Sequence, residues 1–218
     1  MSQAYSLHEN AAIPDKDIRT AIKAGGWPLA AALLCLLATA FPALAEVRER
    51  VEPYAISGRT GLELYLSIGE HGPKAGGGRA IAHTNFKLTW RRNYQRQGNG
   101  CTLVAARPKL VITYTLPKPS APLPAETQRR WDIFVEGIRK HEEVHGAAIK
   151  DMVERIEQTT VGFSVPDDPD CRKIRKAIQK PLSEASQAQR KHSRDFDRVE
   201  MGKGGNIQQL ILGLIGKP

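Results

Sequence analysis

Two hydrophobic periodicities divide the chain into a strand-rich half and a helical half. Across residues 84–90 the larger side chains alternate with polar ones, which is the pattern of a strand with one buried face. From about residue 126 to 159 the apolar positions recur every three or four residues, which predicts one long amphipathic helix. Prolines at 117, 119, 122 and 124 predict an extended linker between the two halves.

Shorter patterns fill in the rest of the strand-rich half. A short helix is expected from Thr60-Gly61 to Gly72-Pro73, and the glycines at 76–78 indicate a flexible loop. A turn is expected at 97–100. The expected strands are 53–58, 82–90, 101–105 and 110–116. Because these strands follow one another through a hairpin, the pattern favours a small antiparallel sheet.

The chain after the long helix predicts more helical structure. A second helix is expected over 171–200, with a kink at Pro181, and the apolar tail 208–217 is expected to pack on the core. The fold class is therefore α+β, with a small antiparallel sheet packed on two long helices. Residues 46–218 are long enough for a single domain.

The N-terminal segment resembles a signal peptide. Residues 27–45 carry no charge and end in Ala43-Leu44-Ala45, the small residues that a signal peptidase reads. Lys16, Arg19 and Lys23 supply a positive flank. We expect residues 1–45 to be removed after Ala45, which predicts a periplasmic or secreted protein. The flank is long for a signal peptide, and retention of the segment as an anchor is the alternative.

Composition and charge narrow the range of partners. The 218 residues are 41% hydrophobic and 25% charged, which excludes collagen-like, low-complexity and wholly disordered chains. The net charge of +9 favours anionic surfaces, and residues 172–180 hold five cations. Contact with an anionic cell-envelope surface is one alternative, and a solvated helix face is the other. Nucleic-acid binding is not expected for an exported chain without a platform of aromatic and basic residues.

Export also changes the interpretation of the three cysteines. Cys35 would leave with the signal peptide, and Cys101 and Cys171 would remain in an oxidising compartment. A disulfide between them would close a loop of about 70 residues and contribute about 3–4 kcal/mol of stability. The alternative is two buried free thiols. Neither cysteine has the neighbouring partner that a structural metal site requires.

A candidate catalytic motif, His141-Glu142-Glu143-Val144-His145, lies within the long helix. Residues four apart on a helix differ by about 40° around the axis, so both imidazoles can reach one metal ion. Zinc accepts neutral imidazole nitrogens, and the carboxylate after the first histidine can serve as the general base. Glu142 is that carboxylate, whereas Glu143 is expected to face solvent. The alternative is a helix that carries two histidines without a metal.

Two histidines leave a metal site incomplete. Asp151 has the spacing of a ligand in short zinc motifs, but on an unbroken helix it points about 120° away from His145, and we reject it. The third ligand is expected on the second helix, and the histidines of the strand-rich half are the alternatives. The candidates are His192, Asp195, Asp197, Glu200, His71 and His83.

Over about residues 50–205 the chain resembles the DUF922 family, bacterial secreted proteins regarded as zinc-dependent proteases. The resemblance rests on Tyr54, Thr60-Gly61, Gly72-Pro73, Trp90, Cys101, Trp131, Phe134, residues 140–146 and Cys171. It implies a zincin-like active-site helix in which His141 and His145 bind zinc and Glu142 is catalytic. It also implies a bond between Cys101 and Cys171.

The chain departs from that family at one place. The family pattern has an aromatic residue and Asp, then a Thr, then His-Gly. Here Phe196-Asp197 fits, but Met201-Gly202 follows and the histidine is missing. A carboxylate is an acceptable zinc ligand, so either Asp197 or Glu200 could replace the histidine, and Asp197 is the third ligand we expect.

The function expected from these features is an exported, monomeric zinc peptidase acting on peptides or proteins. Zn²⁺ would be held by His141, His145 and Asp197, with Glu142 activating water. A metal-binding periplasmic protein without catalysis is the first alternative, because of the missing histidine. A basic envelope-binding protein is the second.

Overall fold

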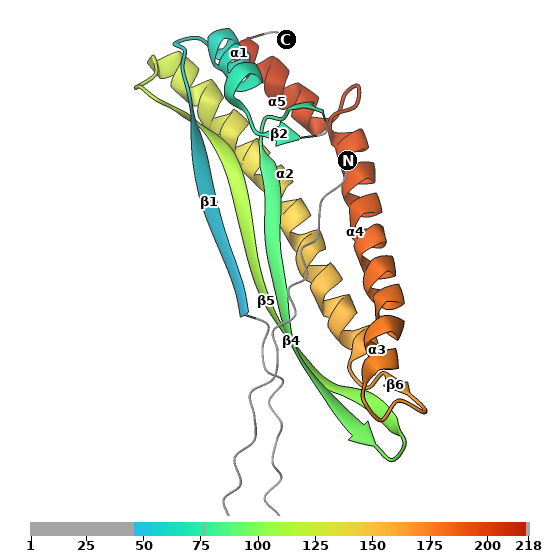
Figure 1. Ribbon diagram of the computed structural model, residues 1–218. Coiled ribbons are helices and arrows are strands. Elements are labelled where there is room, and N and C mark those ends of the chain that lie inside the picture. Colours follow the sequence, from blue (N-terminus) through green and yellow to red (C-terminus); the bar gives the residue numbers. More distant parts are fainter. Residues whose placement is uncertain (1–45, 76, 217–218) are drawn as a thin grey trace, which may run out of the picture.

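The computed structural model describes residues 46–75 and 77–216 (Figure 1). The expected signal peptide and Cys35 lie outside these residues. The described chain forms a sheet on one side of a long central helix, α2, with a further helix, α4, on the other side. This is the mixed helix-and-sheet class expected from the sequence.

The main sheet is built from three long strands in the order β1-β5-β4: β1 (Glu46–Ile56), β5 (Gly100–Pro119) and β4 (His83–Gln97). β4 and β5 form an antiparallel hairpin, but β1 runs parallel to β5, so the expectation of a wholly antiparallel sheet was wrong. The last residues of β1 and the first residues of β4 lie at the same end of the sheet, beside the last residues of β5. The chain runs back along the sheet in β4 and then turns into β5, which therefore has the same direction as β1. Two parallel strands need a connection of this kind, which returns the chain to the starting end of the sheet.

β5 is also one strand of 20 residues rather than the two strands expected. Pro108 does not interrupt it. The pairing of β4 with β5 is irregular at one place, where the register shifts between Asn93 and Tyr94 of β4. Pro117 and Pro119 pair with β1, so the expected linker is shorter and follows residue 119. A two-residue strand, β6 (Ser164–Val165), pairs with the start of β5.

The connection from β1 to β4 contains the short helix that the sequence predicts. Helix α1 (Gly61–His71) begins at Thr60, whose side chain accepts a hydrogen bond from the Glu63 backbone while Glu63 caps the Thr60 amide. It ends at Gly72. The glycine-rich stretch that follows includes two short paired strands, β2 (Lys74–Ala75) and β3 (Gly78–Arg79).

Helix α2 (Ala125–Thr160) confirms the long helix expected from the apolar spacing. Its buried side chains, including Trp131, Phe134 and Ile149, pack in the core together with Leu103, Leu110 and Ile112 of β5. At 36 residues and about 1.5 Å per residue it extends about 54 Å, which makes it the longest of the described helices.

The expected second helix is divided into α3 (Arg172–Ala177) and α4 (Gln179–Glu200). Pro181 has no N–H to donate to the carbonyl of Ala177, and the helix is interrupted at Ile178, which itself keeps a helical conformation. The apolar tail forms α5 (Asn206–Ile215), and buried Ile207 and Leu214 confirm that it packs on the core. Among the helices described, none combines the length and apolarity needed to cross a bilayer.

Candidate metal centre

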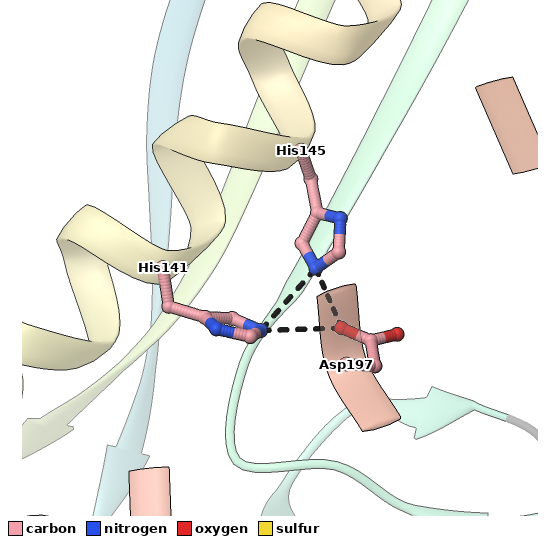
Figure 2. A group of neighbouring side chains, drawn as sticks. All are labelled: His141, His145 and Asp197. Atoms are coloured by element: carbon pink, nitrogen blue, oxygen red, sulfur yellow. Dashed lines mark hydrogen bonds and ion pairs between the residues drawn. The ribbon is translucent and has the colours of Figure 1, made fainter. Parts of the chain in front are cut away.

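His141 and His145 lie one turn apart on α2, on the side that faces α4 (Figure 2). The His141 side chain is 3% exposed and the His145 side chain 13%. Their Nε2 atoms are 3.2 Å apart. The helical spacing therefore brings the two nitrogens to one point beneath the surface.

Asp197 approaches the same point from α4. Its Oδ1 lies 2.9 Å from Nε2 of His145 and 3.3 Å from Nε2 of His141 (Figure 2). Although 52 residues separate it from His145 in the sequence, the three side chains form one cluster whose ligand atoms all lie within 4.8 Å of one another. This cluster could hold a metal ion. We refer to His141, His145 and Asp197 as the metal cluster.

Phe196 and Glu200 surround the metal cluster from the same helix. The Phe196 ring stacks on His141, with 4.7 Å between ring centroids, and meets His145 edge-on at 5.5 Å. Oε2 of Glu200 lies 3.7 Å from Nδ1 of His141, which is too long for a hydrogen bond but close for an ion pair. Glu200 thus faces the nitrogen of His141 that points away from Asp197.

The polar atoms of the metal cluster are incompletely paired. Nδ1 of His141 and Oδ1 of Asp197 are buried and have no hydrogen-bond partner among the described residues, so the contacts to Asp197 are ion-pair contacts without hydrogen-bond geometry. Burial of such atoms costs free energy unless something binds them.

Charge within the cluster shifts the pKa values of its members in opposite directions. Burial would raise the pKa of Asp197, but the contacts with His141 and His145 outweigh it and lower the pKa well below the usual range. Burial would lower the pKa of His145, but Asp197 and the charge of Glu142 outweigh it and raise the pKa. The charge of the metal cluster therefore favours the binding of positive charge, which a metal ion or protons can supply.

Glu142 is buried beside the metal cluster and is held by β4. Oγ1 of Thr84 lies 2.6 Å from Oε2 of Glu142 and 3.1 Å from its backbone oxygen. A hydroxyl has one hydrogen to donate, and an ionised carboxylate is its stronger acceptor. Thr84 therefore fixes the side chain of Glu142 through a bond between segments 58 residues apart.

A second contact sets the distance between α2 and the sheet. Tyr114 of β5 pairs in register with Thr84, and its hydroxyl donates to Oε2 of Glu49, 2.5 Å away. Nζ of Lys150 donates to the other oxygen of Glu49. At Gly146 a Cβ would overlap the Tyr114 hydroxyl, so this glycine allows the close approach.

Most other candidates for the third ligand lie outside the metal cluster. Asp151 and His192 are exposed, and Asp195 pairs with Lys191 and Arg198. His71 is exposed and contacts Ser67. His83 is half-buried at the start of β4. Glu143 pairs with Arg139 on the solvent side of α2, as expected.

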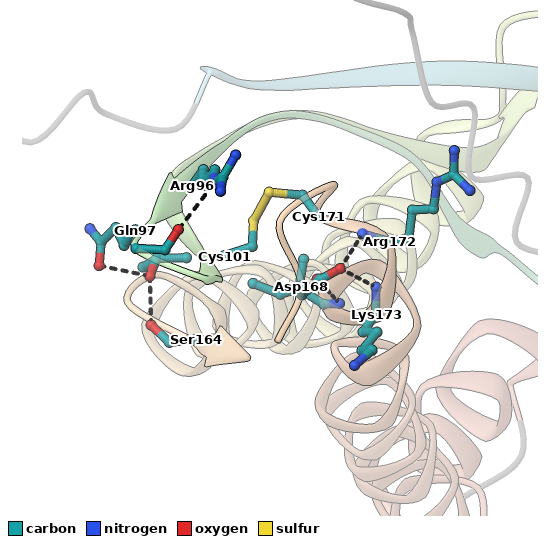
Figure 3. The surroundings of a disulfide bond; sticks show 11 residues. Arg96, Gln97, Cys101, Ser164, Asp168, Cys171, Arg172 and Lys173 are labelled. Carbon is teal, nitrogen blue, oxygen red and sulfur yellow. Dashed lines mark hydrogen bonds between the residues drawn. A yellow bond between two sulfur atoms is a disulfide. The ribbon is translucent and has the colours of Figure 1, made fainter. Parts of the chain in front are cut away.

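The disulfide between Cys101 and Cys171 is present, with 5.2 Å between the two Cα atoms (Figure 3). It joins β5 to the residue just before α3. Asp168 accepts hydrogen bonds from the backbone N–H groups of Arg172, Lys173 and Ile174. Although burial opposes it, these bonds lower the pKa of Asp168. The expected disulfide is confirmed, and the alternative of free thiols was wrong.

Comparison with known proteins identifies the family. The sequence model of a family described as a bacterial protein of unknown function, DUF922, matches residues 51–205. The chain belongs to the DUF922 family. The DUF922 match includes all three residues of the metal cluster, Glu142 and both disulfide cysteines. No curated protein and no solved structure matches the chain.

The resemblance to DUF922 is therefore confirmed as membership, whereas the description of the family as proteases stays a prediction. Within the DUF922 match, sequence reasoning did not find the roles of Thr84, Phe196 and Tyr114. Thr84 is the first residue of the alternating pattern over 84–90, which predicts a strand with one buried face and no more. A polar residue at such a position is a signal that it has a buried partner.

Proposed function

We propose that this DUF922 protein is an exported zinc-dependent peptidase. The observation that carries the proposal is the convergence of two imidazole nitrogens and one carboxylate oxygen from α2 and α4 at 2.9–3.3 Å from one another. A general-base candidate, Glu142, is held next to them by Thr84. The disulfide is of a kind that persists in oxidising compartments outside the cytoplasm, which supports export.

The spacing of the metal cluster supports zinc as the ion. Zinc binds imidazole nitrogen and carboxylate oxygen at about 2.0–2.2 Å, and tetrahedral ligands at that radius lie about 3.3–3.6 Å from one another. The three separations observed are at or slightly below this range, so a small outward movement of the side chains would suit the ion. Three protein ligands would leave the fourth position free, as catalytic zinc sites require.

The surrounding groups support a ligand role for the histidines. A histidine that binds zinc through one nitrogen commonly donates its other N–H to a carboxylate. Glu200 has the place of such a carboxylate, because its Oε2 lies 3.7 Å from Nδ1 of His141. Phe196 covers both rings and limits their rotation. Glu200 is thus an outer partner that orients His141, whereas Asp197 is the third ligand.

Each part of the site would have a separate role in peptide hydrolysis. Bound zinc would polarise a peptide carbonyl and lower the pKa of water. Glu142 would take a proton from the attacking water and return it to the leaving amine. Thr84 would hold the carboxylate in place without accepting the proton. β4 is an edge strand with no partner on its outer side among the described residues, so it can pair with an extended peptide.

A metal-binding role without catalysis is the second candidate. The observation that favours it is Met201, which stands where the family resemblance leads us to expect histidine and is 56% exposed after the end of α4. Both candidates need the metal cluster, and only the peptidase needs Glu142.

Glu142→Gln separates the two candidates. We expect it to lower hydrolysis of an unstructured protein substrate such as casein by about 10²–10⁴-fold while zinc content stays unchanged. Glu143→Gln is the matched control, because it removes the neighbouring carboxylate from the solvent side of the same helix. If the native protein carries zinc but shows no hydrolysis that Glu142→Gln abolishes, the peptidase proposal fails and the binding role remains.

A further inference from the structure

Positive charge is concentrated at one end of the molecule, far from the metal cluster. We define the basic pole as residues 91–107 of the β4–β5 hairpin together with residues 161–180, which include β6 and α3 and lie beside that hairpin (Figure 1). The basic pole holds nine Lys and Arg residues and three Asp residues, a net charge of +6. About a fifth of residues 46–218 thus carries two thirds of their net charge of +9.

Most cations of the basic pole are exposed, and several of them form no ion pair. Eight of the nine are exposed: Arg91, Arg96, Arg107, Arg172, Lys173, Arg175, Lys176 and Lys180. Of these, Lys180 pairs weakly with Glu184, and Arg91, Arg107 and Lys176 form no ion pair with any described residue. Elsewhere the cations more often face carboxylates, as in Arg50 with Glu52 and Arg130 with Glu126.

The basic pole is a fixed surface rather than a loose tail. The disulfide joins β5 to the start of α3, and Asp168 holds the first three backbone N–H groups of α3 (Figure 3). The guanidinium of Arg175 lies 4.2 Å from the ring centroid of Tyr94 and ties α3 to β4. The cations on the hairpin and on α3 are therefore held in one arrangement before any partner binds.

The chemistry of the basic pole favours a broad anionic surface as the partner. Trp90 and Tyr94 already contact the guanidinium groups of Arg92 and Arg175, so they do not form an open platform for stacking nucleic-acid bases. Only one large hydrophobic side chain of the pole, Val161, is among the exposed ones. This composition suits electrostatic adsorption without insertion into a bilayer.

We propose that the basic pole docks this protein on the surface of a bilayer that contains anionic phospholipid. Unmatched Lys and Arg side chains attract the negative surface charge of such a bilayer, and the attraction weakens with salt. Asp197 is 19 residues beyond Ile178 along α4, so docking would hold the metal cluster about 28 Å from the lipid. This proposal does not depend on the proposed peptidase activity.

Sedimentation of the full chain with lipid vesicles tests the proposal. One set of vesicles contains phosphatidylcholine alone, and the other contains phosphatidylcholine with phosphatidylglycerol. Residues 1–45 carry equal numbers of acidic and basic residues, so any binding by the uncharged segment 27–45 affects both sets alike. We expect a preference of at least about tenfold for the anionic vesicles at low salt, which decreases as salt is added.

Two charge-reversed variants locate the effect. Arg172→Glu, Lys173→Glu and Lys176→Glu together should abolish the preference for anionic vesicles. The matched control reverses three exposed cations at the other end, Lys74→Glu, Lys118→Glu and Lys203→Glu, and should keep most of it. An intact disulfide and unchanged thermal unfolding would show that both variants are folded.

Three outcomes of the vesicle assay would overturn the proposal. These are equal binding of the native chain to both vesicle types, loss of the preference in both variants, and retention of the preference by the pole variant. Binding of a single-stranded oligonucleotide without binding of anionic vesicles would also overturn it, and would show that the pole recognises a flexible polyanion.

Discussion

The disulfide region and the metal cluster both join the C-terminal third of the chain to the core, but they do so in different ways. Around the disulfide the polar groups are paired: Asp168 caps α3, and Oγ1 of Thr102 meets Gln97 and Ser164. In the metal cluster, Nδ1 of His141 and Oδ1 of Asp197 are buried without a hydrogen-bond partner.

This difference teaches where to look for function. A region whose polar groups are all satisfied by the protein needs nothing more to be stable, and it serves to hold elements together. A region that buries ionisable groups without satisfying them loses free energy unless a ligand or a proton binds there. The disulfide region is complete as folded, whereas the metal cluster is prepared for an additional group.

Removal of the disulfide is expected to have the largest effect on stability. Cys101→Ser with Cys171→Ser should lower the free energy of unfolding by about 3–4 kcal/mol, because the bond closes a 70-residue loop in the unfolded chain. Urea unfolding of the folded double variant measures this. Zinc content should stay unchanged, since the bond joins β5 to the residue before α3, whereas the metal cluster lies on α2 and α4. Loss of zinc with retained folding would show that the two regions are coupled.

A smaller loss is expected from Gly146→Ala. The new methyl group would overlap the Tyr114 hydroxyl, so α2 would have to shift away from β5. Overpacking of this kind costs about 1–3 kcal/mol, measurable by urea unfolding. Tyr114→Phe in the same chain removes the overlapping oxygen and should recover part of the loss. If Gly146→Ala is as stable as the native protein, the close contact does not set the position of α2.

Much of this architecture is readable from local patterns. The three- and four-residue spacing marks α2, Thr60 and Glu63 mark the start of α1, and the motif from His141 to His145 marks half of the metal cluster. The need for a third ligand points to the helix that follows, and Asp197 is chosen on it because Phe196-Asp197 fits the pattern of the family, although Glu200 is also available.

The features that sequence reasoning missed depend on long-range pairing. Most residues of β1 are exposed, so its first half lacks the alternation that reveals a strand. Whether β1 runs parallel to β5 depends on where the crossover returns the chain, which no local pattern records. The partners of Glu142 and Gly146, Thr84 and Tyr114, come from strands 58 and 32 residues away. They become visible only once the sheet packs against α2.

Thr84→Val tests whether β4 positions Glu142 for catalysis. It leaves the shape of the side chain nearly unchanged but removes the donor at 2.6 Å from Oε2. Under the proposed peptidase function we expect kcat to fall by about tenfold, because the carboxylate of Glu142 loses the hydrogen bond that orients it toward the attacking water. Thr84→Ser keeps the donor and should restore kcat. Equal activity of the native protein and both variants would show that Thr84 does not position Glu142 for catalysis.

The smallest effect, and the one that depends most on pH, is expected at Asp168. Its pKa is lower in the folded protein than in the unfolded chain, so its ionised form stabilises the fold above about pH 4 and loses that contribution as the pH falls. Asp168→Asn should therefore be less stable than the native protein at pH 7, and the difference should narrow at pH 3. Urea unfolding at the two pH values measures it. A difference that does not change with pH would mean that charge is not what holds α3.

The zinc content of the purified full chain, after dialysis against metal-free buffer, tests the metal cluster most directly. The native protein should retain about one zinc per chain, and Asp197→Ala and His141→Ala should each lose it. Asp195→Ala is the matched control: it removes a carboxylate from the same helix that pairs with Lys191 and Arg198, and it should retain zinc. A folded native protein without zinc, or an Asp197→Ala variant that keeps as much zinc as the native chain, would contradict the three-residue site.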